Sequence, residues 1–235
     1  MRITLFGHGR MGCAVEKLAP GRGHEIVNII DPKYNASTAP PGKNGLSGDW
    51  LEKTEAVIDF STPDAAVHNI QTCVTAGIPI IEGTTGWDEH LEEIRQFVEE
   101  NQGTCIHASN FSVGVQVLFQ VACLTGELMS GLADYTPFIS EIHHAGKLDT
   151  PSGTAKTLQH LIQPHYNQTI STSSLRAGTF PGKHDVGFDS PIDTLVLSHT
   201  ARNRLGFASG ALLAAEKINT VRGFVDFSDV LFPKS

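Results

Sequence analysis

Residues 1–12, MRITLFGHGRMG, give the strongest indication of the fold of the first half of the chain. The apolar run at residues 2–6 predicts a short buried strand, and residues 10–18 predict a helix. The glycines between and within them match the pattern G-x-G-x-x-G. In this pattern the first glycine suits a tight turn, the second lets a ligand approach the backbone, and the helix N-terminus offers unpaired N–H groups to a phosphate. Strand, glycine loop and helix in this order favour a dinucleotide-binding fold.

An acidic residue lies where such a fold needs one. Asp31 follows a second predicted strand, residues 25–30, and lies 19 residues after Gly12. This is close to the ~20 residues typical of the acid that binds a ribose hydroxyl. A plain turn in an α/β sheet is the alternative interpretation. We favour a nicotinamide dinucleotide site, whose predicted residues are Gly7, His8, Gly9, Arg10, Met11, Gly12, Asp31 and Lys33.

The residues after the second strand bear on the choice between NADH and NADPH. Asp31 can accept hydrogen bonds from both ribose hydroxyls of NADH but repels a 2′-phosphate, whereas Lys33 attracts that phosphate. Because the two effects partly cancel, we expect the protein to use both cofactors.

Strands and helices alternate up to about residue 110. Further strands are predicted at residues 55–60, 78–81 and 104–108, and helices at residues 63–77 and 87–102. This alternation indicates a parallel sheet with helices on both faces. Polar loops follow three strands, at the edge where open α/β sheets bind ligands. They are either ordinary turns or, as we predict, the lining of the nicotinamide end, formed by Phe60, Ser61, Gly83, Thr84, Thr85, Ala108, Ser109, Asn110 and Phe111.

The pattern changes beyond residue 110. One helix is predicted at residues 114–130, followed by longer strands at 137–144, 183–188 and 192–199 and a single helix after Pro151. The predicted fold class is α/β, with an N-terminal Rossmann-type parallel sheet and a second α+β domain built on a mixed sheet. We expect the dinucleotide-binding domain to span 1–110 and to be completed by 206–235, and the second domain to span 111–205.

The composition excludes several classes of protein. A net charge of −8 over 235 residues disfavours a nucleic-acid partner. The four cysteines are widely spaced, without a C-x-x-C pair, so neither a zinc site nor a disulfide framework is indicated. No run reaches the ~18 apolar residues that a membrane span needs, and the N-terminus turns glycine-rich too early for a signal peptide. We therefore expect a soluble cytoplasmic protein without a nucleic-acid or membrane partner.

Residues 141–155, EIHHAGKLDTPSGTA, hold more hydrogen-bonding groups than a packed element buries cheaply. Pro151 fits the first turn of a helix, where exposed N–H groups suit a carboxylate. The residues that offer these groups are Ser152, Gly153 and Thr154, and positive charge or donors for the same anion come from Lys147 and His144. The segment therefore predicts a site for a small dicarboxylate.

Two alternatives stay open for this segment. A histidine pair at a strand end is more often structural than catalytic. A metal site built from His143, His144 and Asp149 is possible by residue type, but it lacks the helical i, i+4 spacing, and we predict no metal.

Four sequence strings occur in a characteristic order: the glycine loop, GTTG at 83–86, ASNFSVG at 108–114 and HHAGKLDTPSGTA at 143–155. In these strings, and in the run SHTARNRLGFASGAL, the chain resembles the dihydrodipicolinate reductase family over nearly its whole length. It departs from the family pattern twice. The glycine loop is one residue shorter than the commoner form, and Thr150 stands where alanine is usual.

The resemblance implies an NAD(P)H-dependent reduction of 4-hydroxytetrahydrodipicolinate to tetrahydrodipicolinate, with loss of water, in lysine and diaminopimelate biosynthesis. It also implies a homotetramer, with substrate binding and oligomerisation in the second domain. By the same resemblance, His143 is a proton donor or acceptor, Lys147 is the proton donor and His144 binds the substrate. Two other functions stay open, namely a dinucleotide-sensing binding protein without catalysis and a related dehydrogenase of amino-acid metabolism.

Overall fold

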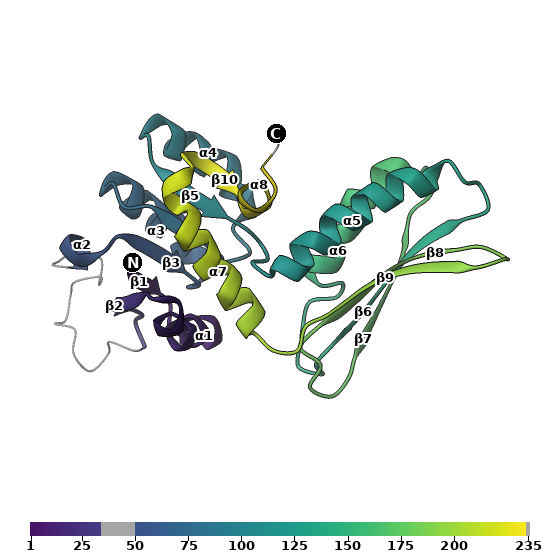
Figure 1. Ribbon diagram of the computed structural model, residues 1–235, viewed down its shortest axis with the longest axis horizontal. Coiled ribbons are helices and arrows are strands. Elements are labelled where there is room, and N and C mark those ends of the chain that lie inside the picture. The colour runs from purple at the N-terminus through teal and green to yellow at the C-terminus, as the bar shows by residue number, and fades with distance from the viewer. Residues whose placement is uncertain (34–49, 234–235) are drawn as a thin grey trace. The chain divides into compact units, whose positions relative to one another are not determined.

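The computed structural model describes residues 1–33 and 50–233, which form two compact units (Figure 1). Unit 1 comprises Met1–Phe111 and Phe207–Ser235, and unit 2 comprises Ser112–Gly206. Each unit contains its own sheet. Unit 1 has a parallel sheet of six strands and unit 2 a mixed sheet of four, so the predicted fold class is confirmed.

The sheet of unit 1 has the strand order β10-β5-β4-β3-β1-β2, and all neighbouring strands are parallel. The strands are β1 (Arg2–Phe6), β2 (Glu25–Ile30), β3 (Ala56–Asp59), β4 (Ile80–Glu82), β5 (Thr104–His107) and β10 (Gly223–Asp226). The helices are α1 (Arg10–Leu18), α2 (Trp50–Lys53), α3 (Pro63–Thr75), α4 (Leu91–Glu100), α7 (Leu205–Lys217) and α8 (Phe227–Leu231), with short 3-10 turns at Pro20–Arg22, Asp88–His90 and Ile218–Thr220.

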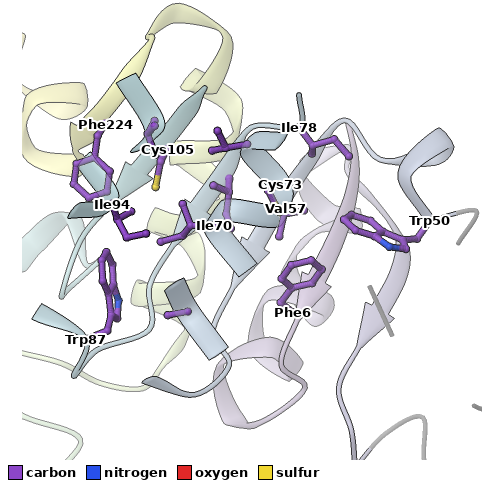
Figure 2. Packing of buried hydrophobic residues seen from close by; sticks show 14 residues of the cluster. Phe6, Trp50, Val57, Ile70, Cys73, Ile78, Trp87, Ile94, Cys105 and Phe224 are labelled. Atoms are coloured by element: carbon purple, nitrogen blue, oxygen red, sulfur yellow. The ribbon is translucent and has the colours of Figure 1, made fainter. Parts of the chain in front are cut away.

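Both faces of this sheet are buried. Alternate strand residues such as Phe6, Val57 and Ile80 pack with Ile70 of α3 and Ile94 of α4 in one apolar cluster (Figure 2). The residues between them on the strands point to the opposite face and are also completely buried, and they include Ile3, Ile58, Ile81 and Ile106. Burial on both faces explains why these strands are nearly continuous apolar runs.

The strands and helices of unit 1 follow the sequence expectations closely up to residue 110, apart from the short helix α2, which was not predicted. Strands at 2–6 and 25–30 and the helix at 10–18 have the predicted bounds. The C-terminal tail was expected to complete the first domain, but no strand was assigned to it. It contributes a sixth strand, β10, which pairs in parallel with β5.

Unit 2 is a mixed sheet in the order β7-β6-β8-β9, with β6 and β7 parallel and the other pairs antiparallel. Its elements are α5 (Val113–Ser130), β6 (Thr136–His143), α6 (Gly153–Ile162), a 3-10 turn (Gln163–His165), β7 (Ser171–Arg176), β8 (Lys183–Asp189) and β9 (Thr194–Thr200). Strand β7 was not predicted, because its sequence STSSLR is polar and carries no clear apolar alternation.

Helices α5 and α6 pack together on one face of this sheet (Figure 1). The cluster beneath them joins Phe119 of α5 and Leu158 of α6 to Ile139 of β6 and Phe188 of β8. Strand residues with the opposite parity point to the other face, which no element of unit 2 covers in the described chain.

Helix α5 needs a correction to the sequence expectations. It is 18 residues long with a mean hydropathy of 1.4, and so passes a test of length and composition for a membrane span. The prediction that no run of this length exists was therefore wrong. One side of α5 packs into the core of unit 2 through Val115, Leu118 and Ala122, whereas Leu124 and Leu128 on α5 are exposed.

Candidate functional site

The glycine loop of unit 1 follows β1 and begins α1. Gly7 has φ +80°, and a Cβ atom there would lie 2.4 Å from the Phe60 carbonyl oxygen. A Cβ atom on Gly12 would lie 2.2 Å from the Gly7 carbonyl oxygen. Nothing lies within 4 Å of the corresponding position on Gly9. Gly7 and Gly12 are thus required by packing, whereas Gly9 leaves open space beside the backbone, as expected where a pyrophosphate approaches.

Asp31 ties the loop to the end of β2. One carboxylate oxygen, Oδ2, accepts the His8 N–H at 2.7 Å, and Oδ1 accepts the Lys33 N–H at 2.7 Å. A ribose hydroxyl would have to share these oxygens, and each can accept more than one hydrogen bond.

A cavity of about 700 Å³ lies at this edge of the sheet of unit 1. It brings together many of the predicted cofactor residues, namely Gly7, His8, Gly9, Asp31, Lys33, Phe60 and Ser61. Sequence reasoning missed the part of the lining that comes from the start of α3, which is Thr62, Ala65, His68 and Asn69. The signal was available, since α3 begins directly after Ser61.

The remaining predicted cofactor residues do not line this cavity, and they are Arg10, Met11, Gly12, Gly83, Thr84, Thr85, Ala108, Ser109, Asn110 and Phe111. Phe111 is buried, with its ring centroid 4.8 Å from that of Phe227, and Ala108 is buried as well. Thr85 and Ser109 are exposed. The contact of these loops with a cofactor stays a prediction.

Two buried acids beneath the loops were also missed. Asp59 ends β3 and Glu82 ends β4, and both are completely buried. Asp59 accepts the Ser61 N–H at 2.8 Å, and Glu82 accepts the Thr84 N–H at 2.6 Å. The two carboxyl groups therefore hold the backbone of both loops.

The candidate catalytic side chains of unit 2 lie at the end of β6, on the face covered by α5 and α6. Glu141 and His143 are two residues apart, so they point to the same side of the sheet. Glu141 pairs in register with Ser174 of β7 and His184 of β8, and His143 pairs with Arg176 of β7. The sheet thus assembles one buried polar cluster from three strands.

Glu141 is the centre of this cluster. Its Oε1 atom accepts the Ser152 N–H at 3.0 Å, the Ser174 hydroxyl at 2.7 Å and an Arg176 N–H at 2.9 Å. Burial raises the pKa of Glu141, but the hydrogen bonds from Ser152, Arg176 and Ser174 outweigh it and lower the pKa to about 2. The side chain is therefore a buried carboxylate at neutral pH.

Two histidine rings lie against the other oxygen of Glu141. The distance from Oε2 is 3.4 Å to His143 Nδ1 and 3.5 Å to His184 Nε2. The ring centroids of the two histidines are 5.0 Å apart. Burial lowers the pKa of His143, an effect that the Glu141 charge opposes. Burial and the neighbouring His143 lower the pKa of His184 to about 4, so His184 is neutral at neutral pH.

The loop after β6 carries Lys147 and His144. The Lys147 ammonium forms an ion pair with Asp149 at 2.7 Å, and the Lys147 N–H donates to the His144 carbonyl oxygen. Arg176 donates to the Asp149 carbonyl oxygen at 2.6 Å, which connects the loop to the Glu141 cluster. Lys147 and His144 are both half-buried.

The start of α6 differs from the sequence expectation. The helix begins at Gly153 with Ser152 as its N-cap, so Pro151 precedes the cap and is not a residue of the first turn. The Ser152 hydroxyl accepts the Ala155 N–H, and its own N–H donates to Glu141. Ser152 is thus used inside the unit, and its contact with a ligand stays a prediction. Gly153 is exposed and borders open space.

Glu141, His143 and His184 are also residue types that bind metal ions, and their ligating atoms lie within 4.8 Å of one another. The Arg176 guanidinium already neutralises Glu141, and a divalent ion would lie beside this fixed positive charge. We assign no metal to the cluster.

The structure thus brings His143, His144, Lys147, Ser152, Gly153 and Thr154 into one unit and the predicted cofactor residues into the other. Sequence reasoning missed Glu141, Arg176 and His184 as members of the cluster. The alternating burial of β6 follows from a period of two in its sequence and was the available signal for Glu141.

Comparison with known proteins explains the two units. Residues 1–111 match the family model for the N-terminus of dihydrodipicolinate reductase. Residues 114–231 match the family model for the C-terminus of the same enzyme. The chain belongs to the dihydrodipicolinate reductase family. The resemblance predicted from the sequence strings is confirmed.

Relatives in this family cover almost the whole chain. A 4-hydroxy-tetrahydrodipicolinate reductase of Christiangramia forsetii is 37% identical, over 98% of this chain and 98% of the relative. One of Staphylococcus haemolyticus is 33% identical, over 98% of this chain and 100% of the relative. A dipicolinate-bound dihydrodipicolinate reductase of Paenisporosarcina has the same fold, with a TM-score of 0.78 at 23% identity over 96% of this chain and 97% of that chain.

Membership of the dihydrodipicolinate reductase family confirms the predicted class of activity. The chain is an NAD(P)H-dependent oxidoreductase of lysine and diaminopimelate biosynthesis. A binding protein without catalysis is therefore excluded as its function.

Proposed function

We propose that the protein reduces 4-hydroxy-tetrahydrodipicolinate with a nicotinamide cofactor held by unit 1 and the substrate held by unit 2. The buried Glu141–His143 contact beside the exposed start of α6 is the observation that carries this proposal. This arrangement places His143, a proton-transfer group, near the start of α6, which is suited to bind an anion. A reductase that acts on a dicarboxylate needs both features.

The cofactor is bound along the glycine loop. The N–H groups at the start of α1 hold the pyrophosphate, and the open space beside Gly9 permits its approach. Asp31 and Lys33 bind the adenosine ribose, and Phe60 and Ser61 line the other end of the 700 Å³ cavity. When bound, the nicotinamide supplies the hydride.

The substrate carboxylate is bound at the start of α6. The Gly153 backbone borders open space, so its N–H is well placed to donate to an anion, with Thr154 beside it. Lys147 and His144, from the loop after β6, add positive charge or a donor. The dipicolinate bound by the Paenisporosarcina enzyme is a dicarboxylate, which supports this class of substrate.

His143 and Lys147 handle the protons. Loss of the 4-hydroxyl group as water, with a proton from the neighbouring ring carbon, gives a conjugated ring. Hydride addition to this ring leaves an enamine-like carbanion that takes up one proton. Lys147, whose ammonium group forms an ion pair with Asp149, is the proton donor. His143 exchanges a proton through the ring nitrogen that does not face Glu141.

The four-stranded sheet supports a homotetramer. The face opposite α5 and α6 carries apolar residues from three strands, and Leu175 and Val196 are 54% and 47% exposed. Phe138 and Ile142 lie on the same face. We expect light scattering to give four times the 25.3 kDa of one chain, and Leu175→Asp with Val196→Asp to lower that mass. We also propose a cytoplasmic location.

The activity is tested directly by the oxidation of NADH. The enzyme should consume NADH when the freshly generated product of dihydrodipicolinate synthase is added, and should not do so with aspartate semialdehyde. Consumption with the semialdehyde alone would instead favour a related dehydrogenase.

A further inference from the structure

We propose that Glu141 is a positioning residue for His143: its Oε2 atom holds the Nδ1 edge of the ring, so that Nε2 is the nitrogen that exchanges a proton with the substrate. The inference deepens the proposed function, because it rests on His143 as the proton-transfer group. It assigns a role to a buried side chain that does not itself touch the substrate.

The two oxygens of Glu141 have different tasks. All three hydrogen-bond donors, from Ser152, Ser174 and Arg176, bind Oε1. Oε2 is buried and has no hydrogen bond to any described residue, and its near neighbours are the two imidazole rings. Three donors fix the carboxylate and keep it ionised, while the second oxygen is aimed at the histidines.

Of the two rings, His143 is the one that depends on Glu141. His184 Nε2 lies 3.1 Å from the Ser152 hydroxyl, closer than the 3.5 Å to Glu141, so His184 has a partner of its own. His143 Nδ1 makes no hydrogen bond with any described residue, and Glu141 Oε2 lies 3.4 Å from it. Because a carboxylate only accepts hydrogen bonds, it favours the His143 tautomer that carries its proton on Nδ1.

The opposite edge of the His143 ring borders a glycine. A Cβ atom on Gly182 would lie 3.1 Å from His143 Nε2, and Gly182 has φ +152°. A side chain at this position would crowd the nitrogen that we assign to proton transfer. Glycine at position 182 therefore leaves room beside the Nε2 edge of this buried ring that a side chain would fill.

Five charged or titratable groups surround His143. They are Glu141 on its own strand, Arg176 on β7, His184 on β8, and Lys147 and Asp149 on the following loop. Arg176 and Lys147 disfavour a charged imidazole, as does burial, whereas Glu141 and Asp149 favour it. The charge of Glu141 raises the pKa of His143 more than the charge of Asp149 does. Removal of the Glu141 charge should therefore make the His143 ring harder to protonate.

The variant Glu141→Gln tests the proposal. Glutamine keeps an acceptor oxygen for the three donors but removes the charge. Side-chain ¹⁵N NMR across pH should show the pKa of His143 falling by about one unit or more. The corresponding limb of the kcat profile should move by the same amount, and the substrate KM should stay within about threefold. Ser174→Ala is the matched control, because it removes one donor from Oε1 and leaves Oε2 facing His143.

Three outcomes separate the possibilities. The proposal is overturned if Glu141→Gln leaves the His143 pKa at the value shared by the wild type and Ser174→Ala. It is also overturned if wild-type ¹⁵N shifts place the neutral proton of His143 on Nε2, a measurement that does not require a variant to fold. A normal kcat for His143→Asn would instead refute the proposed catalytic role, while the NMR titration would still report the coupling to Glu141.

Discussion

Asp59 and Glu82 are register neighbours on β3 and β4, and both carboxyl groups are completely buried. Burial raises the pKa of Asp59, and burial followed by the charge of Asp59 raises the pKa of Glu82 well above its ordinary value. The pair therefore favours a state with one proton between the two acids. Their backbone contacts to Ser61 and Thr84 link this state to the loops of the proposed cofactor site.

Glu82→Gln should stabilise unit 1 at alkaline pH. The folded pKa of Glu82 lies above its unfolded value, so the native state binds more protons, and the free energy of unfolding falls as pH rises through that window. Each pKa unit between the folded and the unfolded value of Glu82 lowers the free energy of unfolding by about 1.4 kcal/mol once the pH has passed both values. Urea unfolding at pH 5 and pH 8 should show a smaller loss of stability in the variant. The exposed Glu93→Gln is the control, and equal losses in Glu82→Gln and wild type would contradict the prediction.

Gly9→Ala should separate cofactor binding from folding. A Cβ atom meets nothing within 4 Å at this position, so the free energy of unfolding should change by no more than about 1 kcal/mol. The added methyl group would meet a bound pyrophosphate, and the Kd for NADH should rise about tenfold or more by calorimetry. Gly21→Ala also meets nothing within 4 Å and lies outside the cavity, so it should leave the Kd unchanged. If Gly9→Ala and Gly21→Ala bind NADH with equal affinity, the pyrophosphate does not lie beside Gly9.

The use of both cofactors is tested by kcat/KM with NADH and with NADPH. The two values should lie within about 100-fold, equivalent to about 2.7 kcal/mol. Lys33→Ala should lower the value for NADPH several-fold and leave that for NADH nearly unchanged, because only NADPH carries the 2′-phosphate. Lys17→Ala, an exposed lysine on α1, should change neither. A preference above 100-fold in the wild type would refute dual use.

His143→Ala and Lys147→Ala should each lower kcat by about 100-fold or more, since general acid catalysis usually contributes that much. The KM for the substrate should change little, whereas His144→Ala should raise it. The NADH affinity should be untouched in all three, because the glycine loop belongs to unit 1. Lys156→Ala, an exposed residue of α6, is the control. If His143→Ala and Lys147→Ala keep a near wild-type kcat and only raise the KM, then His143 and Lys147 bind the substrate and do not transfer protons.

The local structure of unit 1 near the N-terminus could be predicted from the order of its residues. The strand at 2–6, the glycine loop and the helix at 10–18 follow from apolar periodicity and from the steric needs of glycine, which are properties of neighbouring residues. The strings around the glycine loop and residues 143–155 were specific enough to indicate the dihydrodipicolinate reductase family, which the comparisons confirm.

Contacts between residues far apart in the chain became visible only in the folded protein. Glu141 contacts Ser174, Arg176 and His184 because β6, β7 and β8 pair in one register, and no spacing within a single segment encodes that register. The same holds for β10, whose four residues become a strand by pairing with β5 more than a hundred residues earlier. Strand pairing depends on contacts between segments far apart in the chain, so the charge and partners of the Glu141 cluster could be read only from the folded protein.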